Sequence, residues 1–447
     1  MPKVSTQFVC QSCGATRPKW SGKCDDCGAW NSLVETQTAA SSAGHSKRSA
    51  AQAAKPEKLT DVAARQQSRV PCGINEVDQV LGGGIVPGSV MLLSGDPGIG
   101  KSTITLQLAA MIGQSGRVLY VSGEESASQI KLRGDRLGVD SPGLELLAET
   151  NVDTIAATIE QNDYQLVIID SIQTMAVDSL TGSPGTVGQI TASAQILQRV
   201  AKQRHVSLLI IGHVTKEGSI AGPKILEHLV DVVLYLEGDR YGAFKALRGI
   251  KNRFGSTSEV GIFEMTDKGL QPVPNPSAAL LAERQEAPGS VVLATVEGTR
   301  PILVEVQALV SKTAFGYPKR TAAGFDLNRL NLLVAVLQKR ASLNLSDQDI
   351  YVNIVGGLKI SEPAADLAII LAIASAYKNV PVAHNLIAFG EVGLSGEIRS
   401  VNNVSGRLKE AKNLGFRYAV GPSAKQTEGL SSVKTVASAV EAAIKTP

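Results

Sequence analysis

The chain is 447 residues long, which exceeds one ordinary hydrophobic core, so we expect two or three domains. Its composition, with 43% hydrophobic, 19% charged and 4% aromatic residues, is that of a soluble globular protein. The net charge of +3 is nearly neutral and neither requires nor excludes nucleic acid, so any DNA-binding surface must come from local basic clusters.

Neither a secretion signal nor a membrane span is expected. Residues 1–9 lack the apolar stretch of a signal peptide. The longest apolar run, 367–376, is about half of the ~20 residues that a membrane-spanning helix needs, and it predicts a buried helix. Four of the five cysteines form two C-x-x-C pairs, which favour metal binding over disulfides, so we expect a reducing, cytoplasmic compartment.

The two C-x-x-C pairs predict a structural zinc knuckle within residues 1–35. Two such turns can bring four thiolates into a tetrahedron around one Zn²⁺, and a site filled by protein ligands is structural rather than catalytic. A redox dithiol would need one C-x-x-C at a helix start in a βαβ unit, which is absent, and iron in a rubredoxin-like site is a lesser alternative. The expected ligands are Cys10, Cys13, Cys24 and Cys27.

Basic and aromatic residues near the cysteines form a further candidate surface. Cations beside aromatic faces suit either DNA or a protein partner, and the sequence leaves both open. These residues are Arg17, Lys19, Trp20, Lys23 and Trp30.

After a linker-like segment, 36–67, apolar strand patterns alternate with helical patterns over residues 68–273. The expected strands are 90–94, 118–122, 166–170, 207–212 and 230–236, and the helices between them include 102–112 and 189–203. This alternation indicates an α/β fold with a mainly parallel sheet covered on both faces. A Pro-rich joint, 274–287, leads into a second α/β segment, 288–447.

The strongest functional motif is a phosphate-binding loop between an expected strand and an expected helix. It matches G-x-x-x-x-G-K-[ST] in the context that this motif requires. Its glycines let the backbone wrap around phosphates, and the following helix adds its positive end. We expect Lys101 to contact the β- and γ-phosphates of ATP and Ser102 to supply an oxygen to Mg²⁺. The loop consists of Gly95, Asp96, Pro97, Gly98, Ile99, Gly100, Lys101, Ser102 and Thr103.

Carboxylates follow two further expected strands. The strand 166–170 ends at Asp170, which we expect to hold Mg²⁺ through water. The strand 118–122 is followed by Glu124 and Glu125. A hydrolytic NTPase needs a carboxylate to orient the attacking water; Glu124 is the candidate and Glu125 its nearest competitor. In the alternative interpretation, both acidic residues only cap the helix that begins near Ser126.

The strand 207–212 leads to His213 and a loop that reaches residue 224. A polar residue at this strand tip could sense the γ-phosphate and relay its hydrolysis into the loop, or it could only cap the turn. The sequence favours neither interpretation.

Taken in order, the motifs resemble one family. The set comprises the cysteine pairs, residues 82–89, the phosphate loop, residues 122–126 and the K-N-R-F-G segment at 251–255. It closely resembles the RadA (Sms) family of bacterial DNA-repair proteins over essentially the whole chain. The knuckle and the phosphate loop are widespread, whereas K-N-R-F-G after them is far more specific.

The resemblance implies a RecA-like P-loop NTPase that assembles as a hexameric ring around single-stranded and branched DNA. In the family, this DnaB-like motor promotes branch migration, and the RecA recombinase is the implied protein partner. Lys251 and Arg253 match the family motif and look like residues that reach the ATP site of a neighbouring subunit, where a cation can stabilise the transferring phosphate. Without the resemblance, a solvated basic strand edge would be the simpler interpretation.

Two glycine-bearing loops, 176–189 and 214–224, follow the strand tips. In RecA-like rings such loops face the central channel and hold single-stranded DNA. Lys216 and Lys224 are the candidate phosphate contacts, together with Lys251 and Arg253. Contacts of this kind weaken with salt and do not depend on base sequence.

The C-terminal segment resembles the α/β proteolytic domain of Lon protease, with departures at its catalytic positions. Ala364 stands where the family's G-P-S-A-G motif has its serine nucleophile, and the catalytic lysine position falls at Ser405. Without a nucleophilic hydroxyl and its lysine base, the covalent mechanism cannot start. We therefore expect a scaffold that holds the ring together and whose basic residues touch duplex DNA.

Two other functions compete with a DNA-dependent ATPase. An ATP-dependent protease with a zinc-bearing N-terminus is opposed by Ala364. A RecA-type ATP switch that never engages DNA would hydrolyse ATP at a rate unchanged by single-stranded DNA.

Overall fold

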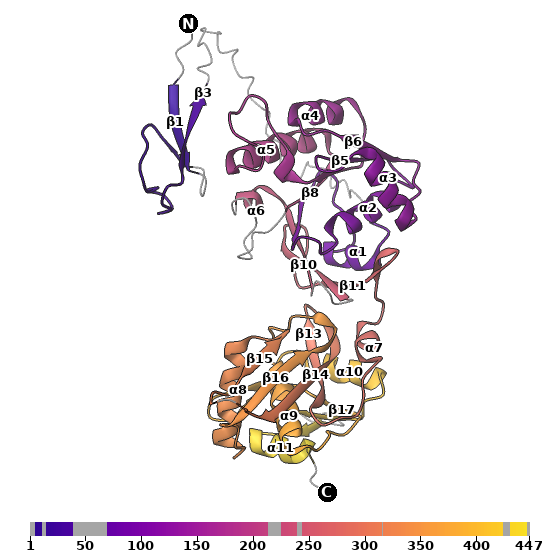
Figure 1. The fold of residues 1–447 in the computed structure, drawn as a ribbon. Helices are drawn as coiled ribbons and strands as arrows, with labels where there is room; N and C mark the ends of the chain where they lie inside the picture. Colours follow the sequence, from indigo (N-terminus) through magenta and orange to yellow (C-terminus); the bar gives the residue numbers. More distant parts are fainter. Residues whose placement is uncertain are drawn as a thin grey trace, which may run out of the picture. The chain divides into compact units, whose positions relative to one another are not determined.

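The computed structural model describes residues 5–10, 15–38, 69–212, 225–238, 244–314, 316–422 and 430–444. The chain divides into two compact units (Figure 1). One comprises residues 1–236, 248–257 and 267–270, and the other comprises residues 237–247, 258–266 and 271–447. Within the described ranges, no helix has the length and apolar character needed to cross a membrane.

The cysteine-rich region forms a small antiparallel sheet in the order β2-β1-β3. Its strands are β1 (Ser5–Cys10), β2 (Thr16–Arg17) and β3 (Leu33–Thr38). The backbone N–H of Cys10 donates to Ala15 O and that of Cys24 to Ala29 O, each at 2.9 Å. Both cysteine turns are therefore closed by a hydrogen bond of the same spacing.

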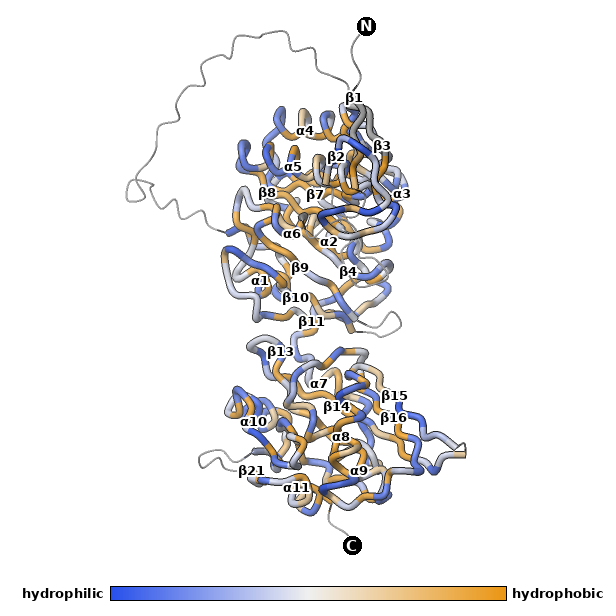
Figure 2. Tube along the Cα trace, turned by 90° about the vertical axis from the view of Figure 1, so that its left-hand side faces the viewer, coloured by the Kyte–Doolittle hydropathy of each residue, from blue (hydrophilic) through white to orange (hydrophobic). Residues whose placement is uncertain are grey.

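Nine strands form the larger sheet, in the order β12-β11-β10-β9-β4-β8-β7-β5-β6, and those from β9 to β6 run parallel. Every residue of β4, β5, β7 and β8 is buried, which explains their apolar sequences (Figure 2). The strands are β4 (Val90–Gly95), β5 (Val118–Ser122), β6 (Leu144–Ala148), β7 (Leu166–Asp170), β8 (Ser207–Ile211), β9 (Val232–Glu237), β10 (Phe244–Asn252), β11 (Val260–Thr266) and β12 (Gly269–Pro272).

Helices connect these parallel strands, as the alternating pattern predicts. On one face of the sheet, α4 and α5 bury Ile155, Ile159 and Leu197 against the strands. The helices are α1 (Asn75–Leu81), α2 (Lys101–Ile112), α3 (Ala127–Leu137), α4 (Val152–Gln161), α5 (Val187–Arg204) and α6 (Ile225–Leu229), with a short 3₁₀ turn, η1 (Ile172–Thr174).

The C-terminal unit contains a seven-stranded sheet in the order β15-β16-β14-β13-β17-β20-β21. Its strands are β13 (Ser290–Glu297), β14 (Arg300–Lys312), β15 (Arg320–Ala323), β16 (Gln348–Ile354), β17 (Leu386–Ala388), β20 (Tyr418–Gly421) and β21 (Leu430–Ser432). A separate hairpin pairs β18 (Glu391–Val392) with β19 (Ile398–Arg399).

The helix predicted over 367–376 is confirmed as α9, which lies in the core of this unit. The segment predicted as a joint, 274–287, contains α7, whose Leu280 belongs to the same core. The helices are α7 (Pro276–Leu281), α8 (Leu327–Arg340), α9 (Ala365–Lys378), α10 (Val404–Asn413) and α11 (Val436–Ala443), with a 3₁₀ turn, η2 (Val355–Gly357).

Candidate active site

The phosphate loop joins β4 to α2 through backbone conformations that favour glycine. Gly95, Gly98 and Gly100 have φ angles of 152°, 78° and 114°. A Cβ at Gly95 would also lie 2.3 Å from the carbonyl oxygen of Leu236 on neighbouring β9. α2 begins at Lys101, directly after the loop, so an anion bound by the loop would face the positive end of a helix.

Lys101 is a buried cation, with 4% of its surface exposed. Its Nζ donates to the carbonyl oxygens of Gly95 and Asp96 at 2.8 and 2.9 Å. Burial lowers the pKa of Lys101, while the carboxylates of Asp170, Asp96 and Glu124 oppose that shift. Because neutral carbonyl oxygens replace water around this ammonium, phosphate oxygens would be stronger partners for it.

Asp170 ends β7 beside β5 and is 6% exposed. Its Oδ2 accepts a hydrogen bond of 2.5 Å from the hydroxyl of Tyr120, a fully buried residue of β5. Burial, followed by the charge and hydrogen bond of Asp170, raises the pKa of Tyr120 well above its usual value. The phenol therefore stays protonated and donates to the carboxylate.

The structure distinguishes the two acidic residues that follow β5. Glu124 Oε1 accepts a hydrogen bond of 2.7 Å from Ser171 Oγ, next to Asp170 in the chain. Glu125 Oε2 instead lies 2.6 Å from Nη1 of Arg133 in an ion pair. Glu124 is thus the acidic residue held beside Asp170, whereas Glu125 is engaged by a cation of α3.

α3 is capped by Ser126 rather than by either acidic residue. The side chain of Ser126 accepts from the backbone N–H of Gln129 in a capping box. The interpretation that Glu124 and Glu125 cap this helix is therefore wrong.

Tyr120 and Ser171 also contact the candidate site, although no motif in the sequence marks them. The available signal was strand periodicity. Residues two apart lie on the same face of a strand, so Tyr120 shares a face with the polar Ser122. Ser122 pairs with Asp170 on the neighbouring strand. Ser171 follows the candidate metal ligand directly and is fully buried.

Lys251 and Arg253 do not join Lys101, Asp170 and Glu124 in their own chain. Arg253 Nη1 lies 3.2 Å from Asp231 Oδ1, and the other carboxylate oxygen of Asp231 accepts from the backbone N–H of Val90. Val90 begins β4, whereas the phosphate loop follows its end, so roughly 17 Å of strand separates them at about 3.3 Å per residue. Lys251 Nζ donates to two carbonyl oxygens at the end of α6, at 2.6 and 2.8 Å.

One of the two predicted DNA loops is described. Gln189, 3% exposed, holds residues 177–182 through its side-chain amide. Its Oε1 accepts from Val177 N at 2.8 Å, and its Nε2 donates to Leu180 O at 3.0 Å and to Gly182 O at 3.2 Å. The other loop, with His213, Lys216 and Lys224, lies outside the described residues.

The predicted zinc ligands come together in the N-terminal sheet. The sulfur atoms of Cys10, Cys24 and Cys27 all lie within 4.8 Å of one another, and Cys13 lies outside the described residues. Cys10 Sγ and Cys27 Sγ are 3.7 Å apart. In a tetrahedral site with Zn–S bonds of about 2.3 Å, neighbouring sulfurs lie about 3.8 Å apart, so this donor set fits zinc.

Replacing Cys10 with serine is expected to remove bound zinc, because a serine hydroxyl does not supply the thiolate that the metal binds. The unaltered protein should carry one zinc per chain, and the variant less than about a tenth of that, by atomic absorption. Cys72→Ser, at a buried cysteine outside the cluster, should keep its zinc. Full zinc content in Cys10→Ser would refute a four-thiolate site.

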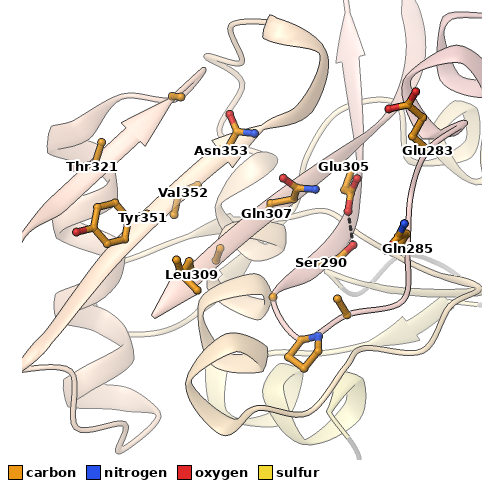
Figure 3. A pocket seen from close by; sticks show the side chains of 15 residues that line it. Glu283, Gln285, Ser290, Glu305, Gln307, Leu309, Thr321, Tyr351, Val352 and Asn353 are labelled. Carbon is orange, nitrogen blue, oxygen red and sulfur yellow. Dashed lines mark hydrogen bonds between the residues drawn. The ribbon is translucent and has the colours of Figure 1, made fainter. Parts of the chain in front are cut away.

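Ala364, at the position of a Lon-type nucleophile, is fully buried and packs with Phe389 and Ala411. A cavity of about 580 Å³ in this unit does not include it (Figure 3). Within the cavity, Ser290 donates to Glu305 at 2.5 Å. The lining combines apolar surface with the polar side chains of Glu283, Gln285, Gln307, Thr321, Tyr351 and Asn353.

An ion pair with one fully buried partner includes a residue close to Ala364 in the chain. Arg407, fully buried, pairs with Glu362, two residues before Ala364. Arg407 also donates to Ala294 O at 2.5 Å, and Glu362 accepts from Thr295 Oγ1 at 2.8 Å. These contacts tie α10 to β13.

Models of three known families match parts of the chain. A model described as an AAA domain matches residues 53–219, and the rubredoxin metal binding domain matches residues 8–35. Subunit ChlI of Mg-chelatase matches residues 329–425. Among solved structures, the KaiC-like protein PH0186 from Pyrococcus horikoshii OT3 is 21% identical, with a TM-score of 0.40, and the match covers 46% of this chain and 99% of that one.

Similarity to curated proteins extends over nearly the full chain. The DNA repair protein RadA of Bacillus subtilis (strain 168) is 48% identical over 95% of this chain and 94% of its own. The DNA repair protein RadA of Halalkalibacterium halodurans is 50% identical over 94% of this chain and 93% of its own. The chain, with its zinc ribbon, RecA-like ATPase domain and Lon-like C-terminal domain, therefore belongs to the RadA family of bacterial DNA repair proteins.

Proposed function

We propose that this chain is a DNA-dependent ATPase of recombinational repair, which works as a homo-hexameric motor on single-stranded and branched DNA and promotes branch migration. Membership of the RadA family supports the repair role and the ATPase chemistry. The RecA recombinase is the proposed protein partner, and the cytoplasm the proposed location.

The convergence of Lys101, Asp170 and Glu124 carries the proposal. They lie at or just beyond the carboxyl ends of β4, β7 and β5, the edge at which open α/β sheets bind their ligands. Burial lowers the pKa of Lys101, while the charges of both carboxylates raise it by less. A buried cation, two carboxylates and a glycine loop at a helix start form a donor set that fits ATP with Mg²⁺.

Bound ATP would supply the phosphoryl group, and Mg²⁺ would supply positive charge to neutralise its phosphates. The backbone N–H groups of loop 95–103 would hold the phosphates, and Ser102 and Asp170 would hold the metal. Glu124 would orient the attacking water, with its own carboxylate fixed by Ser171. Glu125 is the weaker candidate because its charge is already paired with Arg133.

Lys251 and Arg253 would complete the ATP site of a neighbouring subunit. Their distance from their own phosphate loop supports this role, because they cannot serve the site of their own chain from there. Contact with DNA phosphates through Lys216, Lys224, Lys251 and Arg253 would give salt-sensitive binding that is indifferent to base sequence.

Measuring ATP turnover alone, with single-stranded DNA and with forked DNA tests the proposal most directly. Turnover should rise with DNA, and the rise should shrink as salt increases. A rate that no DNA changes would reject the DNA-dependent motor and favour an ATP switch.

An ATP-dependent protease is the second candidate, and restoring the serine should not revive it. In Ala364→Ser, the new hydroxyl would be buried with no lysine base, so no peptide could reach it. Casein incubated with ATP and the variant should remain intact over hours. ATP-stimulated cleavage, absent from the unaltered protein, would show that the Lon-like centre is open to substrate.

A further inference from the structure

We propose that Tyr120 is a positioning residue for the metal-binding carboxylate of Asp170, and that Arg133 and Glu125 hold Tyr120 in its role. The inference rests on the proposed ATPase function of the same site. It adds a set of side chains that lie outside the nucleotide-binding motifs.

The hydrogen bond from Tyr120 fixes which oxygen of Asp170 remains available. Tyr120 OH and Asp170 Oδ2 are 2.5 Å apart, and both residues are almost completely removed from water. A buried carboxylate cannot turn away from such a donor without leaving a charged oxygen unpaired. With Oδ2 engaged, Oδ1 would be the oxygen of Asp170 that helps to hold Mg²⁺ through water.

Arg133 supports the phenol orientation that the carboxylate of Asp170 requires. Its Nη2 lies 3.5 Å from the Tyr120 oxygen, and its Nη1 lies 2.6 Å from Glu125 Oε2. A guanidinium group can only donate, so the phenol oxygen accepts from it and its single hydrogen is directed to Asp170. The ion pair with Glu125 keeps Arg133 at this point. Glu125 thus acts on the site through Arg133 and Tyr120.

Tyr164 offers a matched control in the same domain. It is 6% exposed, and its hydroxyl donates to the carboxylate of Glu145 at 2.8 Å. Tyr164→Phe removes the same hydroxyl and the same kind of bond as Tyr120→Phe. Glu145 lies in β6, at the outer edge of the sheet, so the control leaves Lys101, Asp170 and Glu124 in place.

The test titrates full-length protein with Mg²⁺ and follows both ATP turnover and the binding of a fluorescent ADP analogue. Tyr120→Phe should raise about tenfold the Mg²⁺ concentration that gives half-maximal ATP turnover. A tenfold change corresponds to the free energy of one hydrogen bond to a charged group. Its affinity for the ADP analogue in EDTA should stay unchanged, because Asp170 acts through the metal. Tyr164→Phe should leave the Mg²⁺ midpoint unchanged, although both variants should melt at lower temperature.

A Mg²⁺ midpoint for Tyr120→Phe within about twofold of that for Tyr164→Phe would overturn the inference. If Tyr120→Phe does not fold, Arg133→Gln is tested in its place. This variant keeps the phenol of Tyr120 and removes only the positive charge that contacts the phenol oxygen. Its midpoint should rise about threefold, and an unchanged midpoint would again reject the proposal. Failure of the proposed ATPase function would give a different result from failure of this inference. In that case the unaltered protein itself would neither bind nor hydrolyse the nucleotide.

Discussion

Lys101→Ala protein is expected to hydrolyse ATP at least about 100-fold more slowly than the unaltered protein, with or without DNA. The substitution removes the one lysine of the phosphate loop. Its ammonium is the main group that would stabilise the negative charge developing on the transferred phosphate. Steady-state phosphate release at saturating ATP measures the loss.

Two observations distinguish this loss from misfolding. Burial lowers the pKa of Lys101, so its charge is costly in the folded chain, and removing it should not lower the melting temperature without nucleotide. The rise in melting temperature that ATP causes in the unaltered protein should disappear. Lys131→Ala, at an exposed lysine of α3 paired with Asp135, is the control and should keep full turnover. Turnover of Lys101→Ala within about tenfold of normal would contradict the assignment.

Arg253→Ala is expected to reduce DNA-stimulated turnover by a factor on the order of 10³, the scale of an arginine supplied to a neighbouring site. The chain should still fold. Arg253 is half exposed, and after its loss Asp231 keeps the Lys202 ammonium at 3.6 Å and the backbone N–H of Val90 at 3.1 Å. Arg117→Ala removes another half-exposed arginine paired with a carboxylate and should leave turnover normal.

Mixing two inactive variants tests whether Arg253 acts between subunits. A Lys101→Ala subunit retains Arg253 and could supply it to an Arg253→Ala subunit, whose phosphate loop is intact. Mixed assemblies should therefore recover turnover above that of either variant alone. A mixture as inactive as its components, with mixed assembly verified by crosslinking, would place the action of Arg253 within its own chain.

The sequence predicts the central strands well because burial on both faces leaves them only apolar residues. The expected strand 118–122 matches β5, and 166–170 matches β7. β6 was not expected, since its residues Leu144–Ala148 are half-buried at a sheet edge and carry no alternating pattern. The strands β10, β11 and β12 were missed as well.

The residues of the candidate site can be predicted from the sequence only where a motif places several of them in one short segment. The phosphate loop is such a segment, and Asp170 follows from the end of a strand. Choosing between Glu124 and Glu125 requires knowing that Arg133, on a different element, approaches one of them. The contact between Tyr120 and Asp170 joins two strands, and local sequence does not record that pairing.

The ion pair of Arg407 and Glu362 bears on the evolutionary history of the C-terminal domain. Removing one partner of a fully buried pair costs about 3–5 kcal/mol, which is an upper limit for this pair, because the Glu362 side chain is 22% exposed while Arg407 is fully buried. To match the family's G-P-S-A-G motif and its lysine, the chain would need glycines at 362 and 366, a serine at 364 and a lysine at 405. The first change alone would remove the carboxylate that neutralises the buried charge of Arg407. That step alone would give a less stable protein that still has no nucleophile. The ion pair therefore opposes restoration of the proteolytic motif at position 362.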